Sequence, residues 1–118
     1  MHKIFSFMKR LLLLSTSATL FLSCNKLEIA DNTPSCIQEK IKKFDKSTNC
    51  ETASVKEFSY QGTSVYMFDL GNCGNDMQSE VLNADCKTLG SLGGNVGNNT
   101  INGESFSDAI FIKTIWEK

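Results

Sequence analysis

The spacing of apolar residues after residue 33 predicts an amphipathic helix. In the stretch TPSCIQEKIKKF, Ile37, Ile41 and Phe44 recur at i, i+4 and i+7 and therefore share one side of a helix. Thr33 and Pro34 suit the cap and the first helical position. Four lysines occupy the C-terminal half of this helix, and we interpret them as a solvated face rather than a membrane or partner patch: Lys40, Lys42, Lys43 and Lys46.

Two runs that are rich in β-branched and aromatic residues predict a β-hairpin. They span 54–60 and 63–70, and the Gln-Gly pair between them suits a tight turn. Along the second run, Tyr66 and Phe68 lie on the more uniformly apolar face, so we expect that face to meet the helix. The opposite face includes Val65 and is apolar enough to need a further strand as cover.

The rest of the chain predicts short strands and, over residues 90–104, either a long loop or a set of tight turns. Residues 79–82 and 86–89 have the pattern of two strands joined by a turn, whereas 90–104 has Gly or Asn at almost every turn position. Residues 106–110 fit a short helical turn. Residues 111–117 then predict a strand rich in Phe, Ile and Trp, with an all-helical end as the alternative.

Together these elements predict an α+β fold with one N-terminal helix packed on a small antiparallel sheet. A Gly/Asn-rich loop and two disulfides complete the expected architecture. The chain has 118 residues, enough for one domain. We assign that domain to residues 34–118.

The first residues have the pattern of a secretory signal peptide. A Lys-Arg pair precedes an apolar run of about a dozen residues, which is shorter than the roughly 20 residues of a membrane-spanning helix. The stretch L-F-L-S-C, which ends at Cys24, resembles the lipobox of bacterial lipoproteins. We therefore expect residues 1–23 to be removed, Cys24 to carry the lipid, and residues 24–33 to form a polar tether.

The chain contains five cysteines, and assigning Cys24 to lipid leaves an even number for disulfides. The nearest-neighbour pairing, Cys36 with Cys50 and Cys73 with Cys86, is favoured. Each of these bridges closes a loop of about 15 residues, worth roughly 3 kcal/mol. A bridge from Cys36 to Cys73 or Cys86 would instead link the helix to the sheet, and this is the alternative.

The expected mature chain lacks side chains on which many enzymes depend. The one histidine is His2 and the one arginine is Arg10. Their loss with residues 1–23 excludes His-activated nucleophiles, His-ligated zinc and bidentate Arg sites. The expected mature chain then has nine basic and thirteen acidic residues, and a net charge of −4 does not favour binding to nucleic acid. We therefore expect no enzyme activity, cofactor, metal centre or nucleic-acid partner.

Binding of a protein or peptide is the leading functional hypothesis. Tyr60, Tyr66 and Trp116 are the candidates for a contact face, although each also fits a core position. A small-ligand or calcium site in residues 90–104 is the alternative, because side-chain oxygens gather there. The segment lacks the alternating acidic spacing of a calcium-binding loop.

Several landmarks together resemble a family of small, uncharacterised bacterial lipoproteins that contain a domain of unknown function. The landmarks are a Y-x-G-x-x-V-Y hairpin formed by Tyr60, Gly62, Val65 and Tyr66, a later Gly-Gly segment and the terminal KTIWEK. The resemblance covers most of residues 35–118. It implies a compact α+β domain outside the cytoplasm and implies no activity. Members often carry two adjacent cysteines where this chain has Cys73 alone, so the resemblance leaves the pairing open.

The residue after Cys24 bears on the membrane to which the protein is sorted. It is Asn25, and not the Asp that retains lipoproteins at the inner membrane in some bacteria. We expect an outer-membrane protein that faces the periplasm. Its partners would be the membrane, through the lipid, and an envelope protein.

Overall fold

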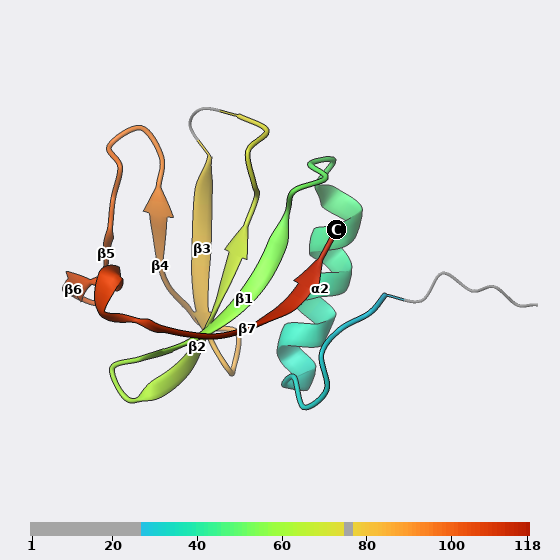
Figure 1. Cartoon of the computed structure of the whole chain (residues 1–118), viewed down its shortest axis with the longest axis horizontal. Helices are drawn as coiled ribbons and strands as arrows, with labels where there is room; N and C mark the ends of the chain where they lie inside the picture. Colours follow the sequence, from blue (N-terminus) through green and yellow to red (C-terminus); the bar gives the residue numbers. More distant parts are fainter. Residues whose placement is uncertain (1–26, 75–76) are drawn as a thin grey trace, which may run out of the picture.

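A computed structural model describes residues 27–74 and 77–118, which form one helix and an antiparallel sheet (Figure 1). Helix α2 spans Ser35–Ser47. The strands are β1 Ser54–Tyr60, β2 Thr63–Asp69, β3 Gln78–Asn83, β4 Thr88–Gly93, β5 Thr100–Ile101, β6 Glu104–Ser105 and β7 Ile110–Glu117, with a 3-10 turn, η1, at Phe106–Asp108. The expected α+β fold class is confirmed. The predicted signal peptide and Cys24 lie outside the described residues.

The main sheet has five strands in the order β4-β3-β2-β1-β7, and every neighbouring pair is antiparallel. Strands β1 and β2 form the predicted hairpin, in which Tyr60 lies opposite Thr63. Gln61 and Gly62 make the turn with φ values of 52° and 83°. Two consecutive residues with positive φ match the right-handed twist of the strands that they join.

The face of the sheet that carries Tyr66 and Phe68 packs against α2, as the alternation of residues predicts. Ile37 and Ile41 are fully buried in this cluster. Phe44 extends it, because its ring packs edge-on against Phe68 with 5.3 Å between ring centroids. Burying these side chains removes apolar surface from water and holds the helix on the sheet.

The opposite face forms a second core, in which Val65 and Val81 pack with Tyr60 and Ile101. Ile101 belongs to β5, so a further strand does cover this face. Of the two alternatives for residues 90–104, the set of tight turns is confirmed and the long loop is wrong, because turns at 94–97 and 102–103 separate short strands. The end of β4, all of β5 and the first residue of β6 lie in that segment. Ile101 of β5 supplies apolar surface that the second core buries to 1% exposure.

Part of the predicted tether belongs to the folded domain. Ile29 and Ala30 pack against the helix-side core, and Ala30 N donates a hydrogen bond to Ile115 O at 3.0 Å. Thr33 is buried, and its hydroxyl donates to Ala30 O rather than capping the helix. Pro34 occupies the N-cap position without a side-chain cap. Ile29, Ala30 and Thr33 of the predicted tether therefore belong to the folded domain.

The structure pairs the cysteines differently from the favoured expectation. Cys36 bonds to Cys86 and Cys50 bonds to Cys73, with Cα–Cα distances of 6.0 and 5.7 Å. The nearest-neighbour pairing is therefore wrong, and the alternative that links the helix to the sheet is right for Cys36. The physical reason is that α2 lies along the sheet. Its first turn meets the β3–β4 turn, and the loop that follows it meets the β2–β3 loop.

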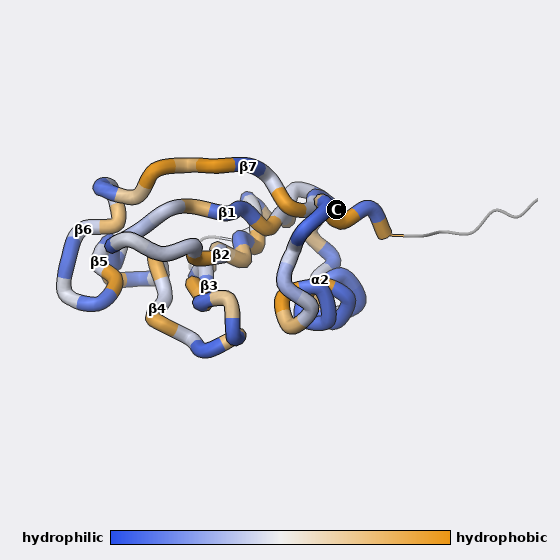
Figure 2. Tube along the Cα trace, turned by 90° about the horizontal axis from the view of Figure 1, so that it is seen from below, coloured by the Kyte–Doolittle hydropathy of each residue, from blue (hydrophilic) through white to orange (hydrophobic). Residues whose placement is uncertain are grey.

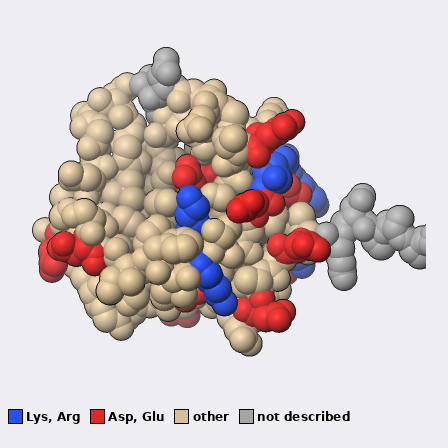
Figure 3. All heavy atoms as spheres, in the orientation of Figure 1, with Lys and Arg blue, Asp and Glu red and all other residues tan. Residues whose placement is uncertain are grey.

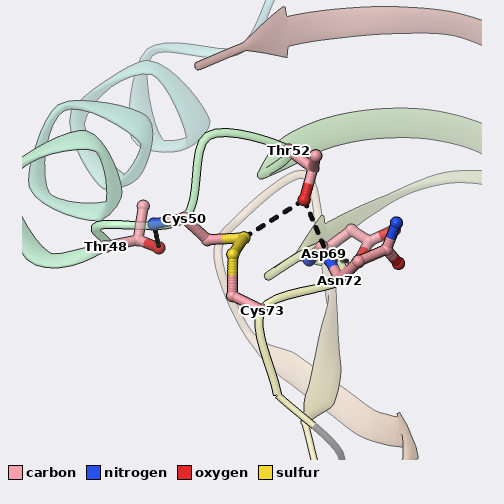
Figure 4. Close-up of a disulfide and its surroundings, with 7 residues drawn as sticks. Thr48, Cys50, Thr52, Asp69, Asn72 and Cys73 are labelled. Atoms are coloured by element: carbon pink, nitrogen blue, oxygen red, sulfur yellow. Dashed lines mark hydrogen bonds between the residues drawn. A yellow bond between two sulfur atoms is a disulfide. The ribbon is translucent and has the colours of Figure 1, made fainter.

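Hydrogen bonds organise the loops around the second bridge (Figure 4). The Thr52 hydroxyl lies 3.1 Å from Cys50 Sγ and accepts a hydrogen bond from Asn72 N at 2.9 Å. Asp69 Oδ1 accepts from Gly71 N at 2.8 Å. Thr52 thus connects the loop that carries Cys50 to the loop that carries its partner.

Candidate functional site

The three aromatic residues predicted to form a contact face are all buried. Tyr60, Tyr66 and Trp116 are 2%, 4% and 3% exposed. Tyr66 and Trp116 belong to the helix-side core, whereas Tyr60 belongs to the other core. The three residues are therefore neither exposed nor on one surface, and the predicted contact face is wrong. Large aromatic side chains gain more from burial in so small a domain than from exposure.

Tyr60 connects the main sheet to the segment that covers it. Its hydroxyl lies within hydrogen-bond distance of Ile101 O (2.6 Å) and Glu104 O (2.9 Å), to which it donates. Burial raises the pKa of this hydroxyl above its ordinary value of 10.0, and Glu104 and Asp108 add to the shift. The role of Tyr60 is to close the second core.

Apart from Val96 in the turn after β4, the large apolar side chains that the structure exposes lie together at the start of β7. Ile110, Phe111 and Ile112 are 67%, 53% and 46% exposed, and we call these three residues the β7 patch. Strand β7 is the outer strand of the sheet beside β1, and its apolar half stands out in Figure 2. Phe111 packs edge-on against Phe58 with 5.7 Å between ring centroids, so the patch rests on a fixed aromatic base.

The sequence contains a signal for this patch that the strand prediction did not use. Three consecutive large apolar residues cannot all reach one covered face of a sheet, because side chains alternate between faces. The pairing of β7 with β1 also shifts register between Glu57 and Phe58, which sets Ile112 outside the regular ladder. Figure 3 shows the side of the molecule that carries β7, where most charged side chains lie toward the C-terminal end of this strand and much of the remaining surface is uncharged.

A groove of about 760 Å³ lies between α2 and the neighbouring strands. Its apolar lining comes from Phe44, Phe68, Leu70 and Met77. Figure 2 shows α2 and β4 on the side of the sheet away from the start of β7. The groove and the β7 patch are therefore separate surfaces.

Two lysines of α2 lie at the edge of this groove. Lys40 approaches Glu80 on β3, with 4.0 Å between Nζ and Oε1. Lys43 also lines the groove, and its side chain makes no hydrogen bond or ion pair with any residue that the structure describes. Two of the four lysines that we expected on a solvated helix face, Lys40 and Lys43, therefore border this groove.

The Asn-rich segment that we considered for calcium uses Asn98 to stabilise its own turn. The side-chain nitrogen Nδ2 of Asn98 donates to Ser91 O at 2.6 Å and to Thr100 O at 3.0 Å. The Thr100 hydroxyl lies 3.2 Å from Oδ1 of Asn98. Within residues 27–74 and 77–118, no three His, Cys, Asp or Glu side chains are grouped as metal ligands would be. Turn formation accounts for Asn98 without a bound ion.

Comparison with known families assigns the domain. The sequence profile of a domain of unknown function, DUF6970, matches residues 39–118. The chain belongs to this family. The DUF6970 match begins inside α2 and includes Cys50, Cys73 and Cys86, while Cys36 precedes it. No curated protein and no solved structure matches the chain. Among the described residues, no helix is long and apolar enough to cross a membrane.

Proposed function

We propose that the protein is a lipid-anchored component of the cell envelope whose domain binds another protein through the β7 patch. The role is non-enzymatic and needs no cofactor. The observation that carries the proposal is the exposure of Ile110, Phe111 and Ile112 on an outer strand. Contiguous exposed apolar side chains mark surfaces that a partner covers.

The sequence supports the anchor. Cys24 follows an apolar run and a small residue, as a lipidated cysteine does. Two disulfides suit an oxidising compartment. Because Ile29 already packs on the core, the five residue steps from Cys24 to Ile29 would hold the domain within about 17 Å of the lipid. We further propose sorting to the outer membrane with the domain in the periplasm.

The anchor is tested by labelling cells with an alkyne fatty acid. The wild-type chain is expected to acquire label and to remain with membranes, whereas Cys24→Ser loses both properties. Cys36→Ser is the matched control, because it removes another cysteine and should leave labelling intact. Equal labelling of wild type and Cys24→Ser would refute lipidation at this residue.

The binding surface is tested with a photoreactive phenylalanine at position 111. This probe is expected to crosslink to one defined envelope protein, and a second variant, Ile110→Ser with Ile112→Ser, should reduce purification of that protein with the domain at least five-fold. The same probe at the exposed position Lys87 is the control. Crosslinking of the same protein from both positions would contradict a specific role for the patch.

A further inference from the structure

The groove beside α2 has an apolar base with a fixed shape. Phe44 is held at the wall of the groove by edge-on contacts with Phe68 and Trp116, at centroid distances of 5.3 and 5.8 Å. Leu70 and Met77, which are half-buried, continue this surface. A volume of about 760 Å³ lies within the range of small-molecule sites. Such a lining selects an apolar group.

The charges at the rim select an anion. The charge of Lys40 is offset by Glu80, which also accepts a hydrogen bond from the Thr88 hydroxyl. Lys43 has no such partner among the described residues, so the charged groups that line the groove sum to one positive charge. The whole chain has a net charge of −1. The groove is therefore a positive site on an acidic protein.

The residue types at the rim favour an anion with a single negative charge. A lysine binds as a point charge, whereas the bidentate recognition typical of phosphate sites uses arginine. Residues 27–118 contain no arginine. A single carboxylate matches one unpaired ammonium group.

We propose that this groove binds a small amphiphile, with a carboxylate at Lys43 and a medium-length alkyl tail over Phe44, Leu70 and Met77. This activity is independent of the β7 patch, because the two surfaces are separate. The apolar tail supplies most of the affinity, and the ion pair with Lys43 distinguishes an acid from the corresponding alcohol.

The test is titration of the full chain, carrying Cys24→Ser to avoid its own lipid, with dodecanoate below its micellar range. Trp116 is the single tryptophan and contacts Phe44, so its fluorescence reports occupancy. Saturable binding is expected with a Kd of about 1 mM or tighter. Dodecanol should bind more weakly, and butyrate should not bind because it lacks the tail.

Matched variants separate the proposed contact from general charge. Lys43→Gln is expected to weaken the binding of dodecanoate about five-fold and to leave the affinity for dodecanol unchanged. Lys46→Gln removes the same charge from the same helix outside the groove lining, and it should change neither affinity by more than about two-fold. Leu70→Asn should weaken the binding of both ligands, because Leu70 is part of the apolar lining. None of these variants should alter crosslinking at position 111, so failure here is distinguishable from failure of the proposed function.

Three results would overturn the proposal. The first is no saturable response of the wild-type groove to dodecanoate. The second is equal weakening by Lys43→Gln and Lys46→Gln, which would assign the attraction to overall charge. The third is binding of an acidic, apolar hexapeptide that depends on Lys43 when dodecanoate does not bind, which would assign the groove to a peptide.

Discussion

Removing the disulfides one at a time tests how the helix is held on the sheet. The two bridges are nested, because Cys50–Cys73 lies within the segment that Cys36–Cys86 closes. The perturbations are two double variants: Cys36→Ser with Cys86→Ser, and Cys50→Ser with Cys73→Ser. Each removes one bridge and leaves no unpaired cysteine from it.

Nesting determines the size of each effect. The bridges span 50 and 23 residues of sequence. With the inner bridge present, the outer one closes an unfolded loop of only about 27 residues, so its removal should lower the free energy of unfolding by about 3.5 kcal/mol. Removing the inner bridge alone reopens a ring of about 50 residues that had been divided in two, which should cost about 3 kcal/mol.

Loss of both bridges should cost about 7 kcal/mol, comparable with the roughly 5–15 kcal/mol that stabilises a typical domain. We therefore expect each double variant to fold and the variant without all four cysteines to be largely unfolded at 37 °C. Urea denaturation followed by Trp116 fluorescence measures these differences, because Trp116 is buried beside Phe44 of α2. The m-value should rise as each bridge is removed, since the unfolded chain expands.

The result that would refute this reasoning is a loss below about 1 kcal/mol in either double variant. Apolar packing alone would then hold that end of the helix. Protease mapping checks the pairing independently. Tryptic cleavage at the lysines should leave peptides 27–40, 47–56 and 57–87 linked together, whereas the nearest-neighbour pairing would release 57–87 as a separate peptide. Further cleavage after Glu80 separates Cys73 from Cys86 and assigns each bond.

Four further outcomes follow from the described contacts. Gly71→Ala should lower the free energy of unfolding by about 2 kcal/mol more than Gly62→Ala in urea denaturation. Both glycines have φ above 80°, but only a Cβ at Gly71 would collide with the side chain and backbone of Thr52; equal losses would show that backbone strain alone decides. Tyr60→Phe should lower Tm by roughly 5 °C in a thermal melt, since two carbonyl oxygens lose their hydroxyl donor. Burial raises the pKa of the Tyr60 hydroxyl, so tyrosine ionises first in the unfolded chain. The contribution of Tyr60 to stability should therefore be independent of pH below about pH 10 and fall as the pH rises further; a midpoint of urea unfolding that is unchanged above pH 10 would contradict this. Trp116→Ala should cost about 3–5 kcal/mol in a calorimetric melt, and a loss below about 1 kcal/mol would contradict its burial in the core.

Local chemistry was sufficient to predict much of this fold. The hairpin required only the Gln-Gly turn between two β-rich runs, and Gln61 and Gly62 occupy the positive φ region that such a turn needs. The periodicity of Ile37, Ile41 and Phe44 likewise selected the side of α2 that faces the sheet. Both features depend on residues that are close neighbours in the sequence.

The disulfide pairing depended on tertiary structure that no local rule contains. Nearest-neighbour bridges are favoured by loop length, but the direction in which α2 lies on the sheet decides which sulfur atoms meet. Cys36 and Cys86 come together although 50 residues separate them. The burial of Tyr60, Tyr66 and Trp116 could not be predicted from local sequence either, because the sequence around a Tyr or Trp does not reveal whether a second layer of structure covers that side chain. Here α2 covers Tyr66, and the β5 segment covers Tyr60.

The placement of the two surfaces bears on how the protein would work when anchored. The segment after the proposed lipid site joins β7 at Ile115, which is five residues, or about 17 Å, along the strand from Ile110. The β7 patch therefore lies at the end of its strand that is away from the anchor, while the groove lies beside α2. A partner bound to the patch leaves the groove open. An amphiphile in the groove and a protein at the patch should thus bind without mutual exclusion, and competition between them would require a change in the position of α2 that both disulfides oppose.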